Sequence, residues 1–273
     1  MRQRETPPAP AAGDTTRGIL RPLAGLERFR LSRVAVPDDL APFATFFWTV
    51  EWDLADGETY EQEVLPFPCV NLVCEDGAYR VHGPGTARFV ARLSASGWVT
   101  GARFTPAGFS AFSRVPMREL VDRVAPAREV VGREPPPPPA TSEEARASLT
   151  AYLREHAAVA APAMALVDRL VARAQADASV VRVDVLAREA GVSMRSLHRL
   201  FERYVGVSTK WVVRRARVQE AAERVARGER VDWVAVAQEL GYADQAHLIR
   251  DFRAQVGETP AAYARRCAAR RGT

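Results

Sequence analysis

The amino-acid sequence predicts an α+β protein with more than one domain: a mostly β N-terminal domain followed by an all-α C-terminal domain. In the first half, short apolar runs alternate with Gly, Pro and Asp turns, a pattern typical of strands. Five consecutive prolines, Pro135–Pro139, then interrupt the chain. Beyond them, apolar residues recur at helical spacing. A length of 273 residues fits two domains of roughly 100–200 residues each.

The N-terminal half is predicted to fold around its own aromatic core. Residues 1–18, rich in Pro, Ala, Gly and Thr, predict a disordered tail. Residues 19–133 predict a β-rich domain, because nine of the eleven phenylalanines lie between Ile19 and Val131 and supply a core. We expect a helix over Phe109–Val124 and strands at Phe43–Trp52, Val64–Val73, Tyr79–His82 and Trp98–Phe104.

The proline run predicts a stiff spacer over residues 134–142. Proline lacks an N–H and fixes φ, so the run continues neither a helix nor a central strand and favours an extended polyproline conformation. Two linker helices are expected over residues 143–175. Thr141 or Ser142 caps the first of them, and the second follows Pro162.

An internal repeat organises the C-terminal region, residues 176–273. Two segments, Gly191–Ser208 and Gly241–Thr259, share the pattern Gly, then Leu-x3-Phe-x4-Gly-x-Ser/Thr. A short amphipathic stretch precedes each segment, and Asp184 and Asp232 are the expected N-caps of these stretches. Each copy therefore predicts a helix, a glycine turn and a second helix.

The turn residues of the repeat suit a sharp change of direction. Gly191 and Gly241 are placed where a helix ends with positive φ, a backbone conformation that favours glycine. Ser193 and Asp244 follow as N-caps of the second helices. This is the helix-turn-helix arrangement, in which the second helix can lie in the major groove of DNA. A helical hairpin in a structural bundle is the alternative.

The outward faces of the second helices favour DNA binding over a structural bundle. Their arginine, glutamine, histidine and serine side chains offer the donors and acceptors that pair with base edges. The long helical stretch between the copies, from Thr209 to about Arg227, is basic as well. We assign Lys210, Arg214 and Arg215 in this stretch mainly to DNA phosphates or to solvent, since phosphate contacts position a protein without specifying sequence.

The charge distribution also singles out the C-terminal third. From Asp177 to the end, the chain has 18 basic and 12 acidic residues, a net charge of +6, whereas the rest of the chain carries −1. Such a concentration of positive charge indicates an anionic partner, and nucleic acid is the usual one. A solvated helical surface is the alternative explanation of the charge taken alone.

Leu186–Arg266 resembles the tandem helix-turn-helix DNA-binding domain of the AraC/XylS transcription regulators, and Ala235–Tyr263 follows that family's signature almost throughout. The resemblance implies a sequence-specific transcription regulator that binds double-stranded DNA and reads successive major-groove segments with two recognition helices. RNA polymerase and a second copy of the chain, in a homodimer, stay open as further partners. The resemblance implies base contacts by Arg195, Ser196, His198, Arg199, Gln245, Ala246, His247 and Arg250.

The N-terminal domain resembles a sensor-type domain that some members of this family carry. Pro66–Val73 and Gly101–Phe109 bear the resemblance, which implies a small-molecule effector of unknown identity or a role in dimerisation. Aromatic residues of this domain either line an effector pocket or fill a solid core. The pocket residues would be Trp48, Trp52, Tyr60, Trp98 and Phe104.

No cofactor, metal or catalytic machinery is expected. Cys69 and Cys74 are an odd number of residues apart, which on one strand places their thiols on opposite faces. Buried inert thiols and redox sensing are both open for them. The sequence has no Gly-x-Ser-x-Gly, phosphate-binding glycine loop or His-x3-His. The chain is therefore predicted not to be an enzyme; an architectural DNA-binding protein and an enzyme with a DNA-targeting module are the rival classes.

The expected location is the cytoplasm. Three cysteines, an odd number, argue against a disulfide framework and indicate a reducing compartment. No window approaches the ~18 uninterrupted apolar residues of a membrane span. The charged N-terminal start is not followed by the apolar segment of a secretory signal.

Overall fold

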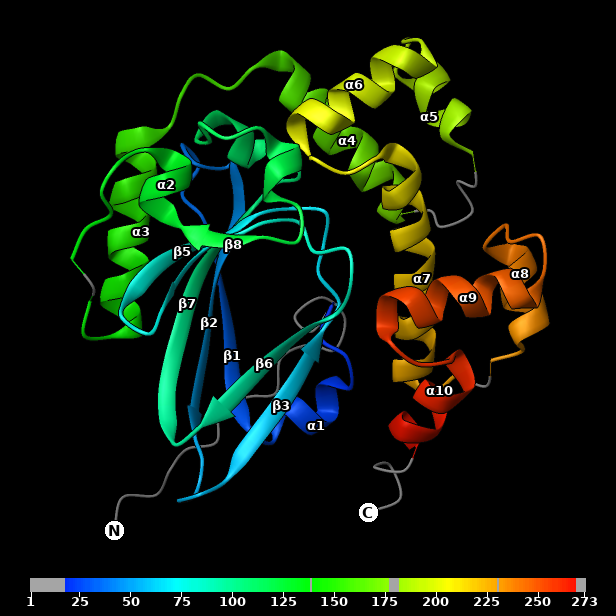
Figure 1. Ribbon diagram of the computed structural model, residues 1–273, viewed down its shortest axis with the longest axis horizontal. Coiled ribbons are helices and arrows are strands. Elements are labelled where there is room, and N and C mark those ends of the chain that lie inside the picture. Colours follow the sequence, from blue (N-terminus) through cyan, green and yellow to red (C-terminus); the bar gives the residue numbers. More distant parts are fainter. Residues whose placement is uncertain (1–17, 138, 177–181, 230, 269–273) are drawn as a thin grey trace.

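A computed structural model of the chain describes residues 18–137, 139–176, 182–229 and 231–268. A β-rich N-terminal domain and a helical C-terminal region lie side by side in it (Figure 1). This arrangement confirms the predicted fold class. The expected disordered tail, residues 1–18, lies outside the described residues except for Gly18.

The N-terminal domain is built on two antiparallel sheets. A short helix, α1 (Pro22–Leu26), precedes the strands. The larger sheet has six strands in the order β1-β2-β7-β4-β5-β8, and β3 pairs with β6 in a separate two-stranded ribbon. The strands are β1 (Phe29–Ala35), β2 (Ala44–Asp53), β3 (Thr59–Val64), β4 (Asn71–Glu75), β5 (Ala78–His82), β6 (Phe89–Ser94), β7 (Ser96–Phe104) and β8 (Val124–Pro126).

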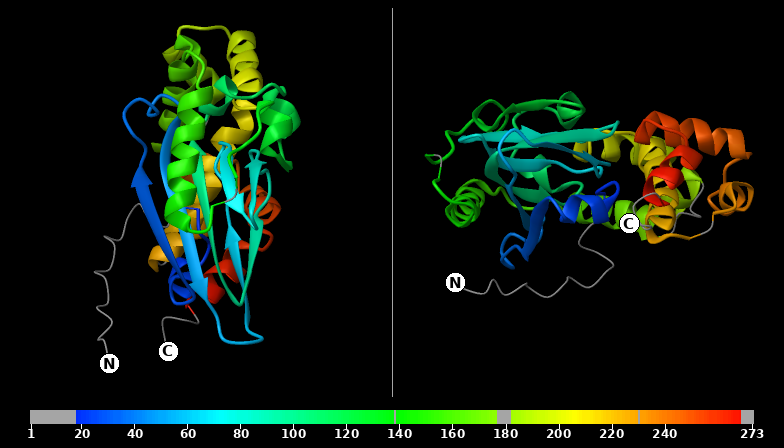
Figure 2. Two further views of the ribbon diagram at one scale, coloured as in Figure 1. Left: turned by 90° about the vertical axis from the view of Figure 1, so that its left-hand side faces the viewer. Right: turned by 90° about the horizontal axis from the view of Figure 1, so that it is seen from below.

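Helix α3 (Ser142–His156) covers one face of the larger sheet, as the left view of Figure 2 shows. Side chains alternate between the faces of a strand, so Phe47 of β2 points towards the main apolar cluster, whereas Trp48 points away from it. The hydroxyl of Ser142 donates to Glu51 of β2 at 2.7 Å and ties the start of α3 to the sheet. The side chain of Thr141 caps α3, accepting from the Glu144 N–H at 3.2 Å.

Two predicted elements of the N-terminal domain are wrong. The expected helix over Phe109–Val124 is two 3-10 turns, η1 (Gly108–Ala111) and η2 (Met117–Leu120), followed by β8. Pro116 stands between the turns and cannot donate the hydrogen bond that a continuous helix needs. The expected strand Val64–Val73 is likewise divided, because β3 ends at Val64 and β4 begins at Asn71, with prolines in the loop between them.

The remaining helices form the C-terminal region. After α2 (Ala127–Val131) and α3, helix α4 (Pro162–Ala176) leads into it. Asp168 of α4 accepts a 2.8 Å hydrogen bond from the Ala107 N–H, so α4 is also tied to the N-terminal domain. The other helices are α5 (Val183–Glu189), α6 (Met194–Tyr204), α7 (Thr209–Arg227), α8 (Trp233–Glu239), α9 (Gln245–Val256) and α10 (Pro260–Ala268).

The helices α5 and α6 are hereafter the first unit, and α8, α9 and the following α10 the second unit. The first unit shares its core with the N-terminal domain: Leu197 and Phe201 belong to the same apolar cluster as Met117 and Phe104. The second unit has a separate cluster around Phe252, to which the described part of the N-terminal domain contributes Leu20 and Leu65. Across the described ranges, no helix has the length and apolar character that a membrane crossing requires.

Candidate nucleic-acid interface

The two glycine turns have the backbone that their sequence positions predict. Gly191 has a φ of 64° and Gly241 a φ of 67°, both in the left-handed region that favours glycine. In each unit the chain therefore leaves one helix and enters the next through a tight turn.

The expected recognition helices, α6 and α9, both begin at a side-chain cap. The hydroxyl of Ser193 accepts from the Ser196 N–H at 3.1 Å at the start of α6. The carboxylate of Asp244 accepts from the His247 N–H at 2.7 Å at the start of α9. Each cap satisfies backbone donors that a helix leaves open at its N-terminus, so the exposed N-terminal halves of α6 and α9 are well fixed.

The helices that precede the turns differ in their caps. Asp232 caps α8 as expected and accepts from the Val234 N–H at 2.9 Å. The predicted cap Asp184 is wrong, because α5 begins after Arg182 and Asp184 lies in its first turn. There Asp184 forms an ion pair with Arg182 at 2.9 Å instead.

The residues expected to contact bases reach the surface of the two recognition helices. Leu197 and Phe201 of α6 and Leu248 and Phe252 of α9 are fully buried, so the opposite faces of both helices point outward. His247 is half-buried, because its ring packs edge-on against Tyr242 with centroids 5.1 Å apart. The others are exposed: Arg195, Ser196, His198 and Arg199 on α6, and Gln245, Ala246 and Arg250 on α9.

The connecting helix α7 holds the two recognition helices apart. Its 19 residues span about 28 Å at a rise of 1.5 Å per residue. Figure 1 shows α6 beside one end of α7 and α9 crossing its other half. Helix α4 packs against both α6 and α7 and so helps to fix the position of α6 relative to α7.

Only part of the expected phosphate contacts is available on α7. Lys210 is exposed in the first turn of the helix. The Nε of Arg214 donates to Asp251 Oδ2 at 2.7 Å, and a second contact joins the same two side chains. This hydrogen bonding to Asp251 raises the pKa of Arg214.

Arg215 is a correction to the expected phosphate contacts, because its side chain is buried at 1% exposure. Its Nε and Nη2 donate to the Pro66 carbonyl at 2.8 and 2.6 Å, and its Nη1 donates to Gln255 Oε1 at 3.0 Å. Burial lowers the pKa of Arg215 to about 9, so it stays charged at neutral pH. Consecutive residues on a helix point in different directions, and composition alone does not tell which of them faces solvent.

The predicted effector pocket is not assembled from the five expected residues. Trp48 and Trp52 lie opposite Gly101 and Gly97 of β7 and stack over them. Phe104 is completely buried and belongs, with the partly buried Trp98, to the cluster on the other face of the sheet. The prediction is wrong because side chains of one strand alternate between faces, and the sequence does not reveal how neighbouring strands are aligned.

Tyr60 of β3 lies near Trp52 in a small cluster of its own, with its ring 6.5 Å from Phe29. Trp52 and Trp98 both line an open depression at the end of β2 and β7, but they reach it from opposite faces of the sheet. None of these positions is an enclosed apolar pocket of the usual ligand-binding kind.

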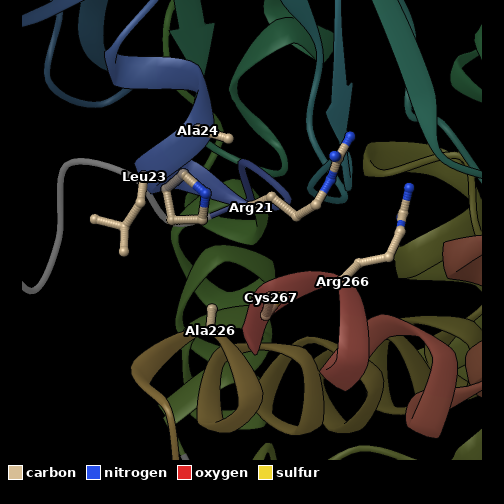
Figure 3. Close-up of a pocket in the computed structure, with 7 residues that line it drawn as sticks. Arg21, Leu23, Ala24, Ala226, Arg266 and Cys267 are labelled. Atoms are coloured by element: carbon tan, nitrogen blue, oxygen red, sulfur yellow. The ribbon is translucent and has the colours of Figure 1, made fainter. Parts of the chain in front are cut away.

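A small crevice lies where the N-terminal domain meets α7 and α10. Figure 3 shows Arg21 and Arg266 extending in the same direction from its two sides. Its volume of about 30 Å³ holds a water molecule or two. Drug-sized ligands need roughly ten times as much.

Next to this crevice, one carboxylate joins the N-terminal domain to the second unit. Glu63 of β3 has a side chain that is 10% exposed and forms ion pairs with Arg21, Arg88 and Arg266. The Nη2 of Arg266 in α10 is 2.8 Å from Glu63 Oε2 and also contacts Glu258. Sequence reasoning missed this cluster, because its members are far apart in the chain and each alone is typical of a surface charge.

The cysteines lie apart from these contacts. Cys69 and Cys74 are buried and free, and burial raises the pKa of the Cys74 thiol. Within the described ranges, no group of three or more His, Cys, Asp or Glu side chains is arranged to hold a metal ion. A buried thiol of raised pKa is a poor nucleophile.

Two family models match the chain. Residues 186–266 match a helix-turn-helix domain, and residues 32–126 match a domain of unknown function, DUF6597. No curated protein is similar to the chain.

Several solved structures are similar to the chain. The DNA-binding domain of AdpA, a global transcriptional factor in complex with a target DNA, is 27% identical, covers 41% of this chain and 97% of its own, and has a TM-score of 0.35. The C-terminal domain of AraT, a response regulator from Geobacillus stearothermophilus, is 22% identical over 40% and 88%, with a TM-score of 0.35. ToxT from Vibrio cholerae is 12% identical over 87% and 98%, with a TM-score of 0.39.

Proposed function

We propose that the chain is a DNA-binding transcription regulator that reads two successive major-groove segments of one operator with α6 and α9, since residues 186–266 match a helix-turn-helix domain. The main observation in support is that both helices pack on the same connecting helix, α7, and have exposed polar faces. The length of α7, about 28 Å, is close to the ~34 Å between successive major-groove segments on one side of B-DNA.

The exposed side chains suit direct reading of bases. Arginine pairs with guanine and glutamine with adenine through two hydrogen bonds each. We assign base contacts to Arg195, Ser196, His198 and Arg199 on α6 and to Gln245, Ala246, His247 and Arg250 on α9. Lys210 is assigned to a phosphate.

We further propose that the N-terminal domain makes DNA reading responsive to an effector. Beside the apolar Leu20 and Leu65, it meets α7 and the second unit through polar contacts: the ion pair of Glu63 with Arg266 and the hydrogen bonds from Arg215 to Pro66. Polar interfaces between domains permit relative motion. An effector that shifts the loop at Pro66 or the strand at Glu63 therefore changes how the second unit is held.

A regulator without an effector is the second candidate, and one observation favours it. Phe104, expected in the pocket, instead fills a solid core against Phe109 and Phe112, with ring centroids 4.8 and 5.3 Å away. In this candidate the N-terminal domain serves self-association in a homodimer. Operator affinity measured with and without a library of small molecules separates the two, because only the first predicts a change.

The cellular location, a further partner and the lack of catalytic activity are proposed on the same basis. A DNA-binding regulator with three free cysteines fits a reducing cytoplasm, where RNA polymerase is a natural partner. The proposal includes no catalytic activity, and substrate turnover by the chain would contradict it.

Selection of bound DNA from a random pool tests the proposal. We expect two preferred half-sites with centres about 10 base pairs apart, one for each recognition helix. Enrichment of a single half-site, or of no sequence at all, would overturn it.

A further inference from the structure

The inward faces of the two recognition helices differ in chemistry. Aligning the repeat places Leu200 of α6 with Asp251 of α9, and Tyr204 with Gln255. In the first unit both positions are apolar or aromatic and join the cluster shared with the N-terminal domain. In the second unit the same positions are polar, and both side chains are buried.

Neighbouring arginines of α7 meet these two polar side chains. Arg214 binds the Asp251 carboxylate with two nitrogens, and Asp251 is only 2% exposed. Arg215 donates to the Gln255 amide oxygen at 3.0 Å. The connecting helix therefore holds α9 at its middle and at its last turn.

A third arginine of α7 reaches the glycine turn of the second unit. Arg217 is buried, and its Nη1 donates to the Gly241 carbonyl at 3.4 Å. Its guanidinium lies 5.4 Å from the centre of the Tyr242 ring. Burial lowers the pKa of Arg217. The turn and the helix that follows it are thus both tied to α7 by directional bonds.

Directional hydrogen bonds restrict the orientation of a helix more narrowly than apolar packing does. A buried ion pair gains little stability over well-packed apolar residues, because both charges lose their water. A planar guanidinium that grips a carboxylate through two hydrogen bonds, however, accepts only a narrow range of orientations. Asp251 directly follows Arg250 in the chain. A rotation of α9 that breaks the Arg214–Asp251 pair therefore also reorients Arg250 relative to the DNA major groove.

We propose that Asp251, gripped by Arg214, is a positioning residue that sets the rotation of α9 on α7 and thereby determines base preference at the second half-site. The inference rests on the proposed function and names a residue that does not touch DNA. Arg214 then acts through Asp251 and not through a phosphate. The first unit needs no such device, because its helix is fixed by the apolar core around Leu197 and Phe201.

The test compares base preference at each half-site for the full chain and its variants. Asp251→Leu gives α9 the residue type that α6 has at this position. We expect discrimination between bases at the second half-site to fall about tenfold, within the range that one good base contact supplies. Preference at the first half-site and the melting temperature should stay close to those of the unmodified chain. Arg253→Gln, at an exposed position of α9, is the control and should leave base preference unchanged.

A second pair of measurements separates positioning from phosphate binding. If Arg214 positions α9, Arg214→Met reproduces the loss seen with Asp251→Leu, and the double variant loses no more than either single variant. If Arg214 binds phosphate, Arg214→Met weakens binding to all sequences and reduces the slope of log K against log salt by about one. The second result, with base preference intact in Asp251→Leu, overturns the proposal.

The result for the unmodified chain shows whether the proposed function or only the positioning role of Asp251 is wrong. If it selects only one half-site, the proposed function itself is wrong. If it selects two half-sites and the Asp251 variants keep the second preference, only the positioning role is wrong. Should Asp251→Leu melt early, Asp251→Asn carries the same test, because it keeps the shape of the side chain and removes the charge.

Discussion

The two helix-turn-helix units have the same local design but are anchored in different ways. The first unit is continuous with the apolar core of the N-terminal domain. The second unit has its own core, to which the N-terminal domain adds only Leu20 and Leu65 among the described residues, and polar contacts link the two: the charges around Glu63 and, through α7, the hydrogen bonds of Arg215. Charge screening by salt does not weaken apolar burial, whereas it weakens ion pairs at a partly exposed interface. Under the proposed function, the first unit is therefore the reader whose position is fixed, and the second is the one whose position can be adjusted.

Core truncation should break the two units differently, and it has the largest expected effect. Phe201 and Phe252 occupy equivalent positions and are both completely buried. Replacing either by Ala should cost about 3–5 kcal/mol. Phe201→Ala should lower hydrogen-exchange protection in the N-terminal domain as well, whereas Phe252→Ala should lower it mainly in α8–α10. Equal loss across the chain in both variants would contradict separate cores.

The glycines that end α6 and α5 offer a comparison inside the first unit. Gly206 has a φ of 87° and an added Cβ would meet the Met117 carbonyl, while Gly191 has a φ of 64° and open space around it. Gly191→Ala should cost about 1–2 kcal/mol for the left-handed backbone. Gly206→Ala should cost about 1–3 kcal/mol more, because it also forces the first unit away from η2. Equal unfolding free energies in denaturant titrations would show that the contact with Met117 yields easily.

Removing the shared carboxylate should loosen the second unit alone. Glu63→Gln leaves Arg21, Arg88 and Arg266, which are partly exposed, without their common anionic partner, at a cost of about 1–3 kcal/mol. We expect faster hydrogen exchange in α9 and α10, an effect that high salt should mimic in the unmodified chain. Arg92→Gln, which removes an exposed ion pair on β6, is the control. Loosening of α6 to the same degree would refute the assignment of Glu63 to the second unit.

Single base contacts should give the smallest effects. Arg199→Ala on α6 and Arg250→Ala on α9 should each lose about 1–3 kcal/mol of binding at one operator position and relax base preference there. Affinities for operators substituted at single positions measure this. Each variant should affect a different half-site, and a uniform loss over all sequences would indicate a phosphate contact instead.

Local features of the fold were predictable from the sequence. The caps Ser193 and Asp244 and the turn glycines depend on residues within a few positions of one another, so their chemistry is visible in the repeat. The strands β2, β5 and β7 followed from apolar runs bounded by turn residues. These elements position the exposed faces of the candidate interface.

Features that depend on strand alignment or on burial between domains were not predictable. Trp48 and Phe104 looked alike in sequence but lie on opposite faces of one sheet. Arg215 was grouped with Lys210 as a surface cation, and its burial follows from a contact with Pro66 that is distant in sequence. The role of Asp251 appears only when the partner helix is in place, because a lone acidic residue in a helix is usually solvated.

The packing of the linker helices bears on how this protein tolerates being cut or recombined. Helix α3 caps the sheet of the N-terminal domain, α4 braces α6 and α7, and the first unit continues the core of the domain before it. A chimera joined at the proline run would separate α3 from the sheet that it covers. A chimera joined just before α5 would expose the apolar side of the first unit to solvent. In this architecture the N-terminal domain and the first unit are not interchangeable modules, and the natural boundary runs between the first unit and the second.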